Sequence, residues 1–351
     1  MRIALVAELP PPRGGMAMQA ERLTQGLRDE GHTVVNVPTN ALDHASPWRR
    51  VPVLRGVLNL GLFLRRLHAA RDAECVHVFS HSFLSFFLFT APAALAARLW
   101  GRRLLIHYHG GAAGPFLKRW GRLAYPVLRA ADRIVVPSGF LVEVLLRHGF
   151  DAVEVPNTID LHAFDYRPRQ AVQPHLLVAR HLEPEYNVAC ALRAFARIAE
   201  GRPQARLTVA GDGRERAHLE RLARDLGVAQ HVRFAGRVDR VGMLALYAEA
   251  DVLLNSSRTD NQPVSILEAF ASGVPVVSTR VGGIPYLVTD GRDGLLAGDD
   301  DSDGLARQVM ALVDQPGLAS RLAAAGRRRV EQHAWENVYP LLRALYEVGS
   351  P

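Results

Sequence analysis

Two carboxylates near the start of one predicted helix are the residues of this 351-residue chain best placed to do chemistry. Asp260 and Glu268 follow the apolar run Val252 to Leu254, which is typical of a buried strand, and Gly273 ends the helix. Ligands of parallel sheets bind at the carboxyl ends of strands, and a helix amino end presents N–H groups to phosphate. Two acids would repel a phosphate-bearing ligand unless they accept hydrogen bonds from its hydroxyl groups, which sugar and ribose rings supply. A solvated helix face with a single cap explains the same pattern, and periodicity alone favours that simpler interpretation.

The helix that must position these acids has its own start signals. Asn261 is expected to cap it with its side chain, and Pro263 suits its first turn. Apolar residues at helical spacing predict a buried stripe formed by Val264, Ile266, Leu267, Phe270 and Ala271. The polar residues recur at steps of four, three and four and should share the opposite face: Asn261, Ser265, Glu268 and Ser272.

The stretch DNQPVSILEAFASGVPVVSTRVGGIPYLVTDGRDGLL, which begins at Asp260, resembles the donor-site signature of the GT-B glycosyltransferases of family 4. The resemblance implies that Asp260 contacts the transferred sugar and that Glu268 contacts the ribose hydroxyls. An aspartate stands at 260 where the family usually has glutamate. The run from Ala131 to Phe164 resembles a second family pattern, so the resemblance extends over nearly the whole chain.

Three further loops of the second half follow predicted strands. Arg180 comes after the strand predicted at 175–179, where an arginine can pair with a diphosphate, although a surface arginine is the alternative. The family carries Arg there and a Lys a few residues on, but residues 183–187 contain no lysine. The resemblance implies three further groups of substrate-binding residues. They are the G-x-G turn (Gly211 and Gly213), the base-binding loop (Arg237 and Val238), and the residues around the helix start (Asn261 and the backbone of Pro263, Val264 and Ser265).

The first half offers its own candidates at strand ends. Gly14 and Gly15 separate a predicted strand at 3–7 from a predicted helix, and such glycines allow close approach of a ligand, although a plain turn is the alternative. His107 and His109 follow the strand predicted at 104–107. One histidine there could be structural, or it could serve as a general acid/base or bind a sugar hydroxyl. The family frequently has His-Gly at this point, which favours His109 as the catalytic residue.

Strands and helices alternate in both halves at a spacing typical of right-handed βαβ units. We therefore expect an α/β protein, and the resemblance implies the GT-B architecture of two Rossmann-like domains facing a central cleft. The expected boundaries are 1–168 for an acceptor domain and 169–335 for a donor domain, with a linker near 167–174. The helix at 336–351 is expected to return to the first domain.

The first 168 residues hold 20 Lys and Arg against 13 Asp and Glu, and so carry the whole net charge of +7. This asymmetry predicts an anionic partner, either a membrane surface or nucleic acid, although biased arginine usage explains it equally simply. Basic residues mixed with large apolar ones favour the membrane, and no nucleic-acid-reading motif is found. These mixed patches are Trp48-Arg49-Arg50, Leu62 to Arg66 and Phe116 to Trp120.

Two distant cysteines and a short first apolar run predict neither a disulfide framework nor a leader peptide, so we expect a cytoplasmic protein, with peripheral attachment to the inner face of the plasma membrane as a possibility. The predicted function is that of a retaining glycosyltransferase that moves a sugar from a nucleotide diphosphate sugar to a glycan or lipid-linked acceptor, in polysaccharide or glycolipid assembly. No metal or other cofactor is expected. The alternatives are a non-catalytic bilobal subunit that binds nucleotide sugars, or a nucleotide-sugar epimerase or phosphorylase of related fold.

Overall fold

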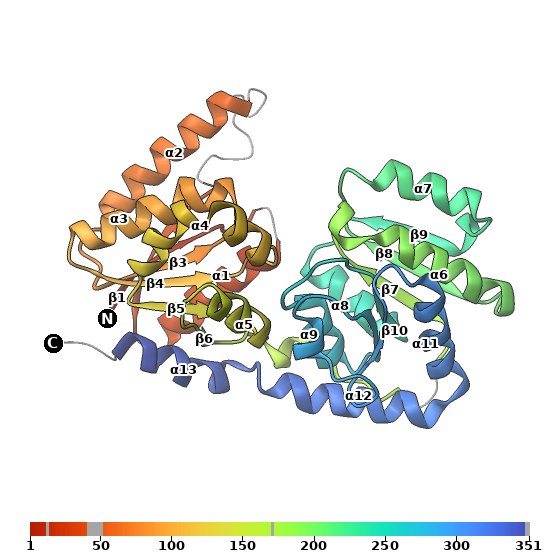
Figure 1. Cartoon of the computed structure of the whole chain (residues 1–351). Coiled ribbons are helices and arrows are strands. Elements are labelled where there is room, and N and C mark those ends of the chain that lie inside the picture. The colour runs from red at the N-terminus through yellow and green to blue at the C-terminus, as the bar shows by residue number, and fades with distance from the viewer. Residues whose placement is uncertain (12–13, 41–51, 170–171, 348–351) are drawn as a thin grey trace. The chain divides into compact units, whose positions relative to one another are not determined.

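The computed structural model describes residues 1–11, 14–40, 52–169 and 172–347. The chain divides into two compact units, each an α/β layer structure (Figure 1). Unit 1 comprises Met1–Thr158 together with Trp335–Pro351, and unit 2 comprises Ile159–Ala334. Unit 1 thus ends at Thr158, before the boundary expected at 168, and it includes the helix that begins at Trp335.

Unit 1 is built on a parallel sheet of six strands in the order β2-β1-β3-β4-β5-β6. Its central strands are buried on both faces, as parallel strands covered by crossover helices must be. The strands are β1 (Arg2–Ala7), β2 (Thr33–Pro38), β3 (Cys75–Ser80), β4 (Arg103–Tyr108), β5 (Arg133–Val136) and β6 (Val153–Glu154).

Helices cover both faces of this sheet (Figure 1). One face packs against α2 (Pro52–Ala69), the π-helix η2 (Phe86–Thr90), α3 (Ala91–Leu99), α4 (Ala113–Arg129) and α5 (Gly139–Arg147). The opposite face packs against α1 (Gly15–Asp29) and α13 (Trp335–Glu347). The π-helix η2 runs directly into α3, and Pro92 lies in the first turn of α3, where proline is tolerated.

Unit 2 has a second parallel sheet of six strands, in the order β12-β11-β10-β7-β8-β9. The strands are β7 (His175–Ala179), β8 (Arg206–Ala210), β9 (Val232–Gly236), β10 (Val252–Asn255), β11 (Val276–Thr279) and β12 (Leu295–Ala297). The longer helices are α6 (Val188–Gly201), α7 (Arg216–Asp225), α8 (Arg240–Glu249), α9 (Val264–Ser272), α11 (Ser302–Asp314) and α12 (Pro316–Glu331), and α10 (Ile284–Leu287) is a single turn. The predicted α/β class with two Rossmann-like halves is confirmed.

Each sheet contains one place where the strand order reverses. In unit 1 this switch point lies between the neighbouring strands β1 and β3, and in unit 2 it lies between β7 and β10. The connections on either side of a switch point run in opposite directions, which leaves a crevice outside the carboxyl ends of the two strands. Ligands of open α/β sheets bind in that crevice.

The last helix belongs to the core of unit 1. Trp335 of α13 packs directly on Gly26 of α1, where an added Cβ would lie 2.5 Å from the indole ring. The Trp335 ring stacks on Tyr339, and its Nε1 donates a hydrogen bond to Glu30 at 3.1 Å. Gly26 is therefore required by the close approach of the two helices.

Histidines form a buried column in the same unit. The Tyr346 hydroxyl of α13 lies 2.6 Å from Nδ1 of His77, whose Nε2 lies 3.3 Å from Nδ1 of His107. The ring of His107 lies 4.2 Å from that of His109. Burial lowers the pKa of His77 and of His109 to about 3, and burial lowers that of His107 well below the ordinary value. All three rings are therefore neutral at neutral pH.

Replacing Gly26 with Ala should destabilise unit 1 by about 1–3 kcal/mol, because the methyl group would force α1 and α13 apart. Gly61→Ala is the matched control: this helical glycine has no atom within 4 Å of an added Cβ, so the substitution should be neutral or stabilise by roughly 0.5–1 kcal/mol. Urea unfolding followed by tryptophan fluorescence measures both, since Trp48, Trp100, Trp120 and Trp335 all belong to unit 1. Equal stability of the two variants would contradict the packing.

Acidification should destabilise unit 1. A histidine with a folded pKa near 3 and an unfolded pKa near 6.5 binds more protons when unfolded between these values. Its contribution is complete above pH 6.5 and is lost as the pH falls, by about 2 kcal/mol per such histidine at pH 5. His107→Leu removes one titrating ring, so its free energy of unfolding should depend less steeply on pH between 7 and 5. An unchanged slope would show that His107 does not take up a proton on unfolding.

Candidate active site

Two of the predicted site residues meet at the switch point of unit 2. Arg180 follows β7, Asp260 lies in the loop after β10, and the two form an ion pair with each side chain 12% exposed. The Arg180 guanidinium also donates from Nε to Asn255 at 2.9 Å and lies over the ring of Tyr186. The sequence predicts a diphosphate contact for Arg180 and a sugar contact for Asp260 separately. The structure brings the two side chains together.

Close backbone contacts hold the Asp260 loop in place. The N–H of Gly283 donates to the Asp260 carbonyl at 2.9 Å, and an added Cβ at Gly282 would lie 2.1 Å from that same oxygen. Gly282 also has a φ of +52°, in the left-handed region. The glycine pair after β11 is therefore needed for the position of Asp260, independently of any ligand.

Glu268 is a half-buried residue of α9. The Tyr247 hydroxyl donates a hydrogen bond to it at 3.0 Å. Burial, and next the adjacent Glu268 carboxylate, raise the pKa of Tyr247 well above its ordinary value, so the phenol remains a donor. The hydrogen bond from Tyr247 therefore orients the Glu268 carboxylate. The sequence pattern did not identify this buried tyrosine.

The start of α9 corrects three expectations. Pro263 occupies the cap position without a side-chain cap, and Asn261 lies before it, so Asn261 is not the predicted helix cap. Proline has no N–H group, which leaves Val264 and Ser265 to supply the donors of the first turn. The helix is buried around most of its surface: Ser265 and Ser272 are buried rather than solvated, and Val264 is half-buried.

The loop after β8 lies against the loop after β7, and the loop after β9 lies against the loop after β8. Gly211 has a φ of +145°, and an added Cβ would lie 1.8 Å from the Arg180 carbonyl oxygen. An added Cβ at Gly213 would lie 2.4 Å from the Leu182 carbonyl oxygen, so both glycines are required by backbone packing. Arg237 is largely exposed and pairs with Asp212 at 3.4 Å, while Val238 packs against the core of the unit.

The predicted site residues of unit 1 are Gly14, Gly15 and His109, and their ligand contacts stay predictions. Gly14 caps α1 with ordinary backbone angles, and an added Cβ would meet nothing within 4 Å, so no steric need for glycine exists there. Gly15 is the exposed first residue of the helix. His109 is 9% exposed and its ring lies among Phe79 and His107. Its Nε2 has no hydrogen-bond partner among the described residues.

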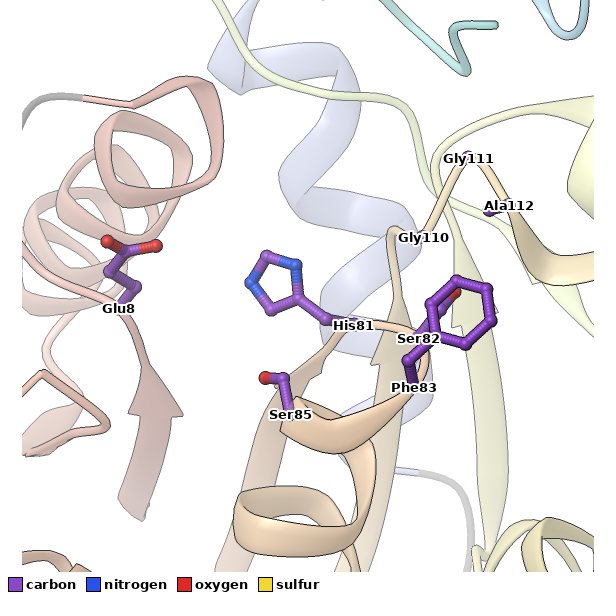
Figure 2. Close-up of a pocket in the computed structure, with 8 residues that line it drawn as sticks. All are labelled: Glu8, His81, Ser82, Phe83, Ser85, Gly110, Gly111 and Ala112. Carbon is purple, nitrogen blue, oxygen red and sulfur yellow. The ribbon is translucent and has the colours of Figure 1, made fainter. Parts of the chain in front are cut away.

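A pocket of about 440 Å³ opens at the switch point of unit 1. Its walls come from the loops after β1, β3 and β4: Glu8, His81, Ser82, Phe83, Ser85, Gly110, Gly111 and Ala112. Figure 2 shows Glu8 and His81 extending from the ends of β1 and β3 into the same space. We call it the β1–β3 pocket. The histidine in its wall is His81, whereas the predicted His109 is not among the lining residues.

Sequence reasoning missed these residues although a signal was present. Glu8 directly follows the apolar run of β1, and Ser80 to Ser82 are polar residues at the end of the buried strand β3. The same logic that selected His109 at the end of β4 applies to both strands. The missing information was the strand order, because only neighbours at a switch point form the crevice.

The acidic run Asp299 to Asp303 has defined structural partners. Asp300 accepts hydrogen bonds from Asn187 and Arg258, Asp301 caps α11, and Asp303 pairs with Arg197. Among the described residues, no group of three or more His, Cys, Asp or Glu side chains is arranged to hold a metal ion. The expectation that no cofactor is needed stays a prediction.

The apolar and basic patches of unit 1 divide between core and surface. Phe63, Phe116 and Leu117 are buried, and their side chains belong to the core. On α4, Trp120 and Leu123 are 38% and 60% exposed, beside the exposed basic residues Lys118, Arg119 and Arg122. Trp48-Arg49-Arg50 lies outside the described residues. No helix in the described part of the chain combines the length and the apolar character that crossing a bilayer requires.

Each half of the chain matches a known family of glycosyltransferases. The family described as glycosyltransferase family 4 matches residues 13–163, and the family described as glycosyl transferases group 1 matches residues 173–315. The two matches together cover most of both units.

Curated proteins are similar to this chain over different shares of its length. A GDP-mannose-dependent alpha-(1-6)-phosphatidylinositol monomannoside mannosyltransferase of Mycolicibacterium smegmatis is 29% identical, with 91% of each chain covered. A glycogen synthase of Mycobacterium tuberculosis is 32% identical over 58% of this chain and 47% of its own length. The chain thus spans about half of the glycogen synthase, and it spans 54% of a phosphatidyl-myo-inositol mannosyltransferase of Mycobacterium leprae that is 30% identical.

Solved structures share the fold over the whole length. Anabaena Alr3699/HepE in complex with UDP and glucose has a TM-score of 0.78 at 18% identity, covering 99% of this chain and all of the other. Sucrose-phosphate synthase of Thermosynechococcus elongatus has a TM-score of 0.79 at 21% identity, covering 98% of each chain. The solved structures show that the chain has the GT-B fold, and the two family matches show that it belongs to glycosyltransferase family 4.

Proposed function

We propose that this protein transfers a hexosyl group from a nucleotide diphosphate sugar to an acceptor hydroxyl, with retention of the anomeric configuration. The observation that carries the proposal is the meeting of Arg180 and Asp260 at the switch point of unit 2, next to the first turn of α9. A cation, a carboxylate and helix N–H groups at this position match the diphosphate and the hydroxyls of such a donor. In this scheme Gly211, Gly213, Arg237 and Val238 lie along the nucleotide.

Arg180 can serve a donor without giving up its present partners. A guanidinium has five N–H donors, and the hydrogen bonds to Asn255 and Asp260 use two of them. Cleavage at the anomeric carbon develops negative charge on the leaving diphosphate, and prepositioned donors stabilise it. Arg180 and the N–H groups of Val264 and Ser265 supply such donors, so the proposal includes no metal ion.

The aspartate at 260 and the tyrosine at 186 are linked in this proposal. Tyr186 lies in the loop where the family carries a lysine, and its ring lies 5.1 Å from the Arg180 guanidinium. The aromatic ring and the carboxylate hold one cation between them, which fixes its direction. We infer that one well-oriented arginine does here what two cations do elsewhere in the family.

The acceptor is assigned to unit 1, and a glycan or lipid-linked acceptor is proposed. His109 is proposed to bind a substrate hydroxyl through its unpartnered Nε2. With a pKa of about 3 the imidazole is neutral near pH 7. It can therefore accept or donate a hydrogen bond, but it is not protonated to act as an acid and its low pKa makes it a weak base.

Attachment to an anionic membrane surface is proposed for α4. This helix carries Lys118, Arg119, Arg122 and Arg129 and contains no Asp or Glu. Trp120 and Leu123 are exposed beside these charges, which is the composition that binds anionic headgroups at the interface. A location at the inner face of the plasma membrane accords with this chemistry.

Glu268→Gln should weaken donor binding by about 10- to 100-fold, because a neutral amide accepts weaker hydrogen bonds from ribose hydroxyls than a carboxylate does. Calorimetry with UDP, GDP and ADP and their hexose conjugates identifies the donor and measures the loss. Tyr247→Phe is the control, since it removes the hydrogen bond to Glu268 but keeps the charge. It should lower stability and weaken donor binding less than Glu268→Gln does, because the carboxylate loses its orienting partner but not its charge.

Transfer assays with the donor that calorimetry identifies then test catalysis. Asp260→Glu should retain more activity than Asp260→Ala, and EDTA should not reduce the rate. Proton NMR of the product shows whether the anomeric configuration of the donor is kept. Wild-type affinity of Glu268→Gln would contradict the assigned role of Glu268. Donor binding without turnover on a wide acceptor panel would favour a non-catalytic binding subunit.

Replacing Trp120 and Leu123 together with Glu should reduce binding to phosphatidylglycerol-containing vesicles at least tenfold, because it removes the apolar contact and reverses the local charge. Co-sedimentation at low and at physiological salt measures binding, and salt should weaken it in the wild type. Leu146→Glu is the control, since Leu146 is equally exposed but lies on α5. Equal loss in both variants would place attachment elsewhere.

A further inference from the structure

The ion pair between Arg180 and Asp260 is held from both sides before any ligand binds. The Arg180 Nε donates to the Asn255 Oδ1 at 2.9 Å, and the buried Asn255 amide itself donates to the Ser278 hydroxyl at 2.9 Å. On the other side, the Asn261 N–H donates to Asp260 Oδ1 at 2.8 Å, and Oδ2 of the same carboxylate accepts from Arg180. Each oxygen of Asp260 therefore has a fixed partner, and the carboxylate is held beside the guanidinium.

Arginines of the neighbouring loops are also matched with acids. Residues that follow β8, β9 and β10 form three such ion pairs: Arg214 with Glu183 at 2.8 Å, Arg237 with Asp212 at 3.4 Å and Arg258 with Asp300 at 2.8 Å. Residues 183–187 contain no lysine. These cations are thus balanced one for one, and a diphosphate that binds Arg180 meets a carboxylate already beside that guanidinium.

A nucleotide diphosphate sugar and the nucleotide that remains after transfer differ in charge. Transfer breaks the bond between the anomeric carbon and the phosphate oxygen, which keeps the electron pair, while the acceptor oxygen bonds to that carbon and loses its proton. The terminal phosphate becomes a monoester with a second pKa of about 6, so it carries about one more negative charge near pH 7. The departed sugar also takes away hydroxyls that can donate to a carboxylate.

The Asp260 carboxylate consequently acts on the two ligands in opposite senses. In the donor complex, sugar hydroxyls donate to the carboxylate and offset the cost of a negative charge near the diphosphate. With the spent nucleotide, the same carboxylate faces an additional phosphate charge and has no sugar hydroxyl to bind. The Asn261 N–H and Arg180 hold the carboxylate in place, so it does not turn away from that charge.

We propose that Asp260 makes the donor site of unit 2 discriminate against the spent nucleoside diphosphate, so that this product leaves after the sugar has been transferred. The proposal rests on the proposed glycosyl transfer, because only a sugar donor brings the hydroxyls that offset the repulsion. Asp260 is then a specificity-determining residue that sets the affinity for the product as well as for the sugar.

The wild-type protein provides the first test. UDP, GDP and ADP are titrated by calorimetry, without acceptor, beside their hexose and N-acetylhexosamine conjugates. For the nucleoside whose conjugates bind, the dissociation constant of the bare diphosphate should exceed that of the tightest conjugate at least tenfold. A bare diphosphate that binds as tightly as its conjugates would overturn the proposal.

The variant Asp260→Asn then assigns the effect to the carboxylate. The amide has the same shape and still accepts from Arg180 but carries no charge, so the bare diphosphate should bind at least tenfold tighter than to wild type, while the conjugate gains less. Asp260→Glu keeps the charge and should keep the preference for the conjugate. Asp314→Asn is the matched control, since it removes a carboxylate paired with Arg202 at 2.7 Å, and Arg202 precedes the amino end of β8, at the opposite edge of the sheet. This control should bind both ligands as wild type does.

Equal weakening of both ligands by Asp260→Asn would show that the carboxylate only orients Arg180, and it would overturn the proposal. Circular dichroism establishes whether this variant is folded, and the wild-type comparison decides if it is not. Sugar transfer with equal affinities for the donor and the spent nucleotide would contradict the discrimination alone. If none of the nucleotides binds, the proposed transfer fails together with this proposal.

Discussion

Parallel strands place all of their carboxyl ends at one edge of a sheet, and everything functional in this molecule depends on that constraint. Where the strand order reverses, two neighbouring ends have no helix crossing over them. In unit 2, Arg180 and Asp260 lie in the loops after the two strands that flank this point. In unit 1, Glu8 and His81 follow the corresponding two strands of its own sheet. The two units thus place different side chains at the same kind of position: an arginine paired with an aspartate in unit 2, and the pocket residues Glu8 and His81 in unit 1.

Local patterns were enough to predict the α/β class and most elements. The apolar run before Asp260 is β10, and the strand expected at 175–179 is β7. Prediction failed where the outcome depends on partners distant in sequence. The polar face assigned to α9 assumes solvent on one side, but α8, α12 and β11 surround the helix, so Ser265 and Ser272 are buried. Sequence spacing cannot reveal how many neighbours a helix has.

The lack of information on distant partners also explains which features of the candidate site could not be predicted. Arg180 and Asp260 were each selected from a local motif, but their pairing joins residues 80 positions apart and needs the strand order to be known. His109 was chosen for its place after a strand, yet its own strand is not at the switch point, and its ring turns into a column of histidines. Gly211 and Gly213 were selected for ligand contact, which stays a prediction, and the structure adds that the close approach of protein backbone requires glycine at both positions. The family resemblance contributed functional roles that no local pattern contains.

The return of α13 to unit 1 has a consequence for synthesis of the protein. Val338, Leu342, Leu345 and Tyr346 complete the core that also contains Ile3, Leu5 and Leu27. On the ribosome, the apolar face formed by β1 and α1 stays uncovered until α13 has been translated. Unit 2 is continuous in sequence and can fold before then, although it is made second. The amino-terminal half is therefore the last to be completed, and truncated nascent chains would expose that face to aggregation or to chaperones.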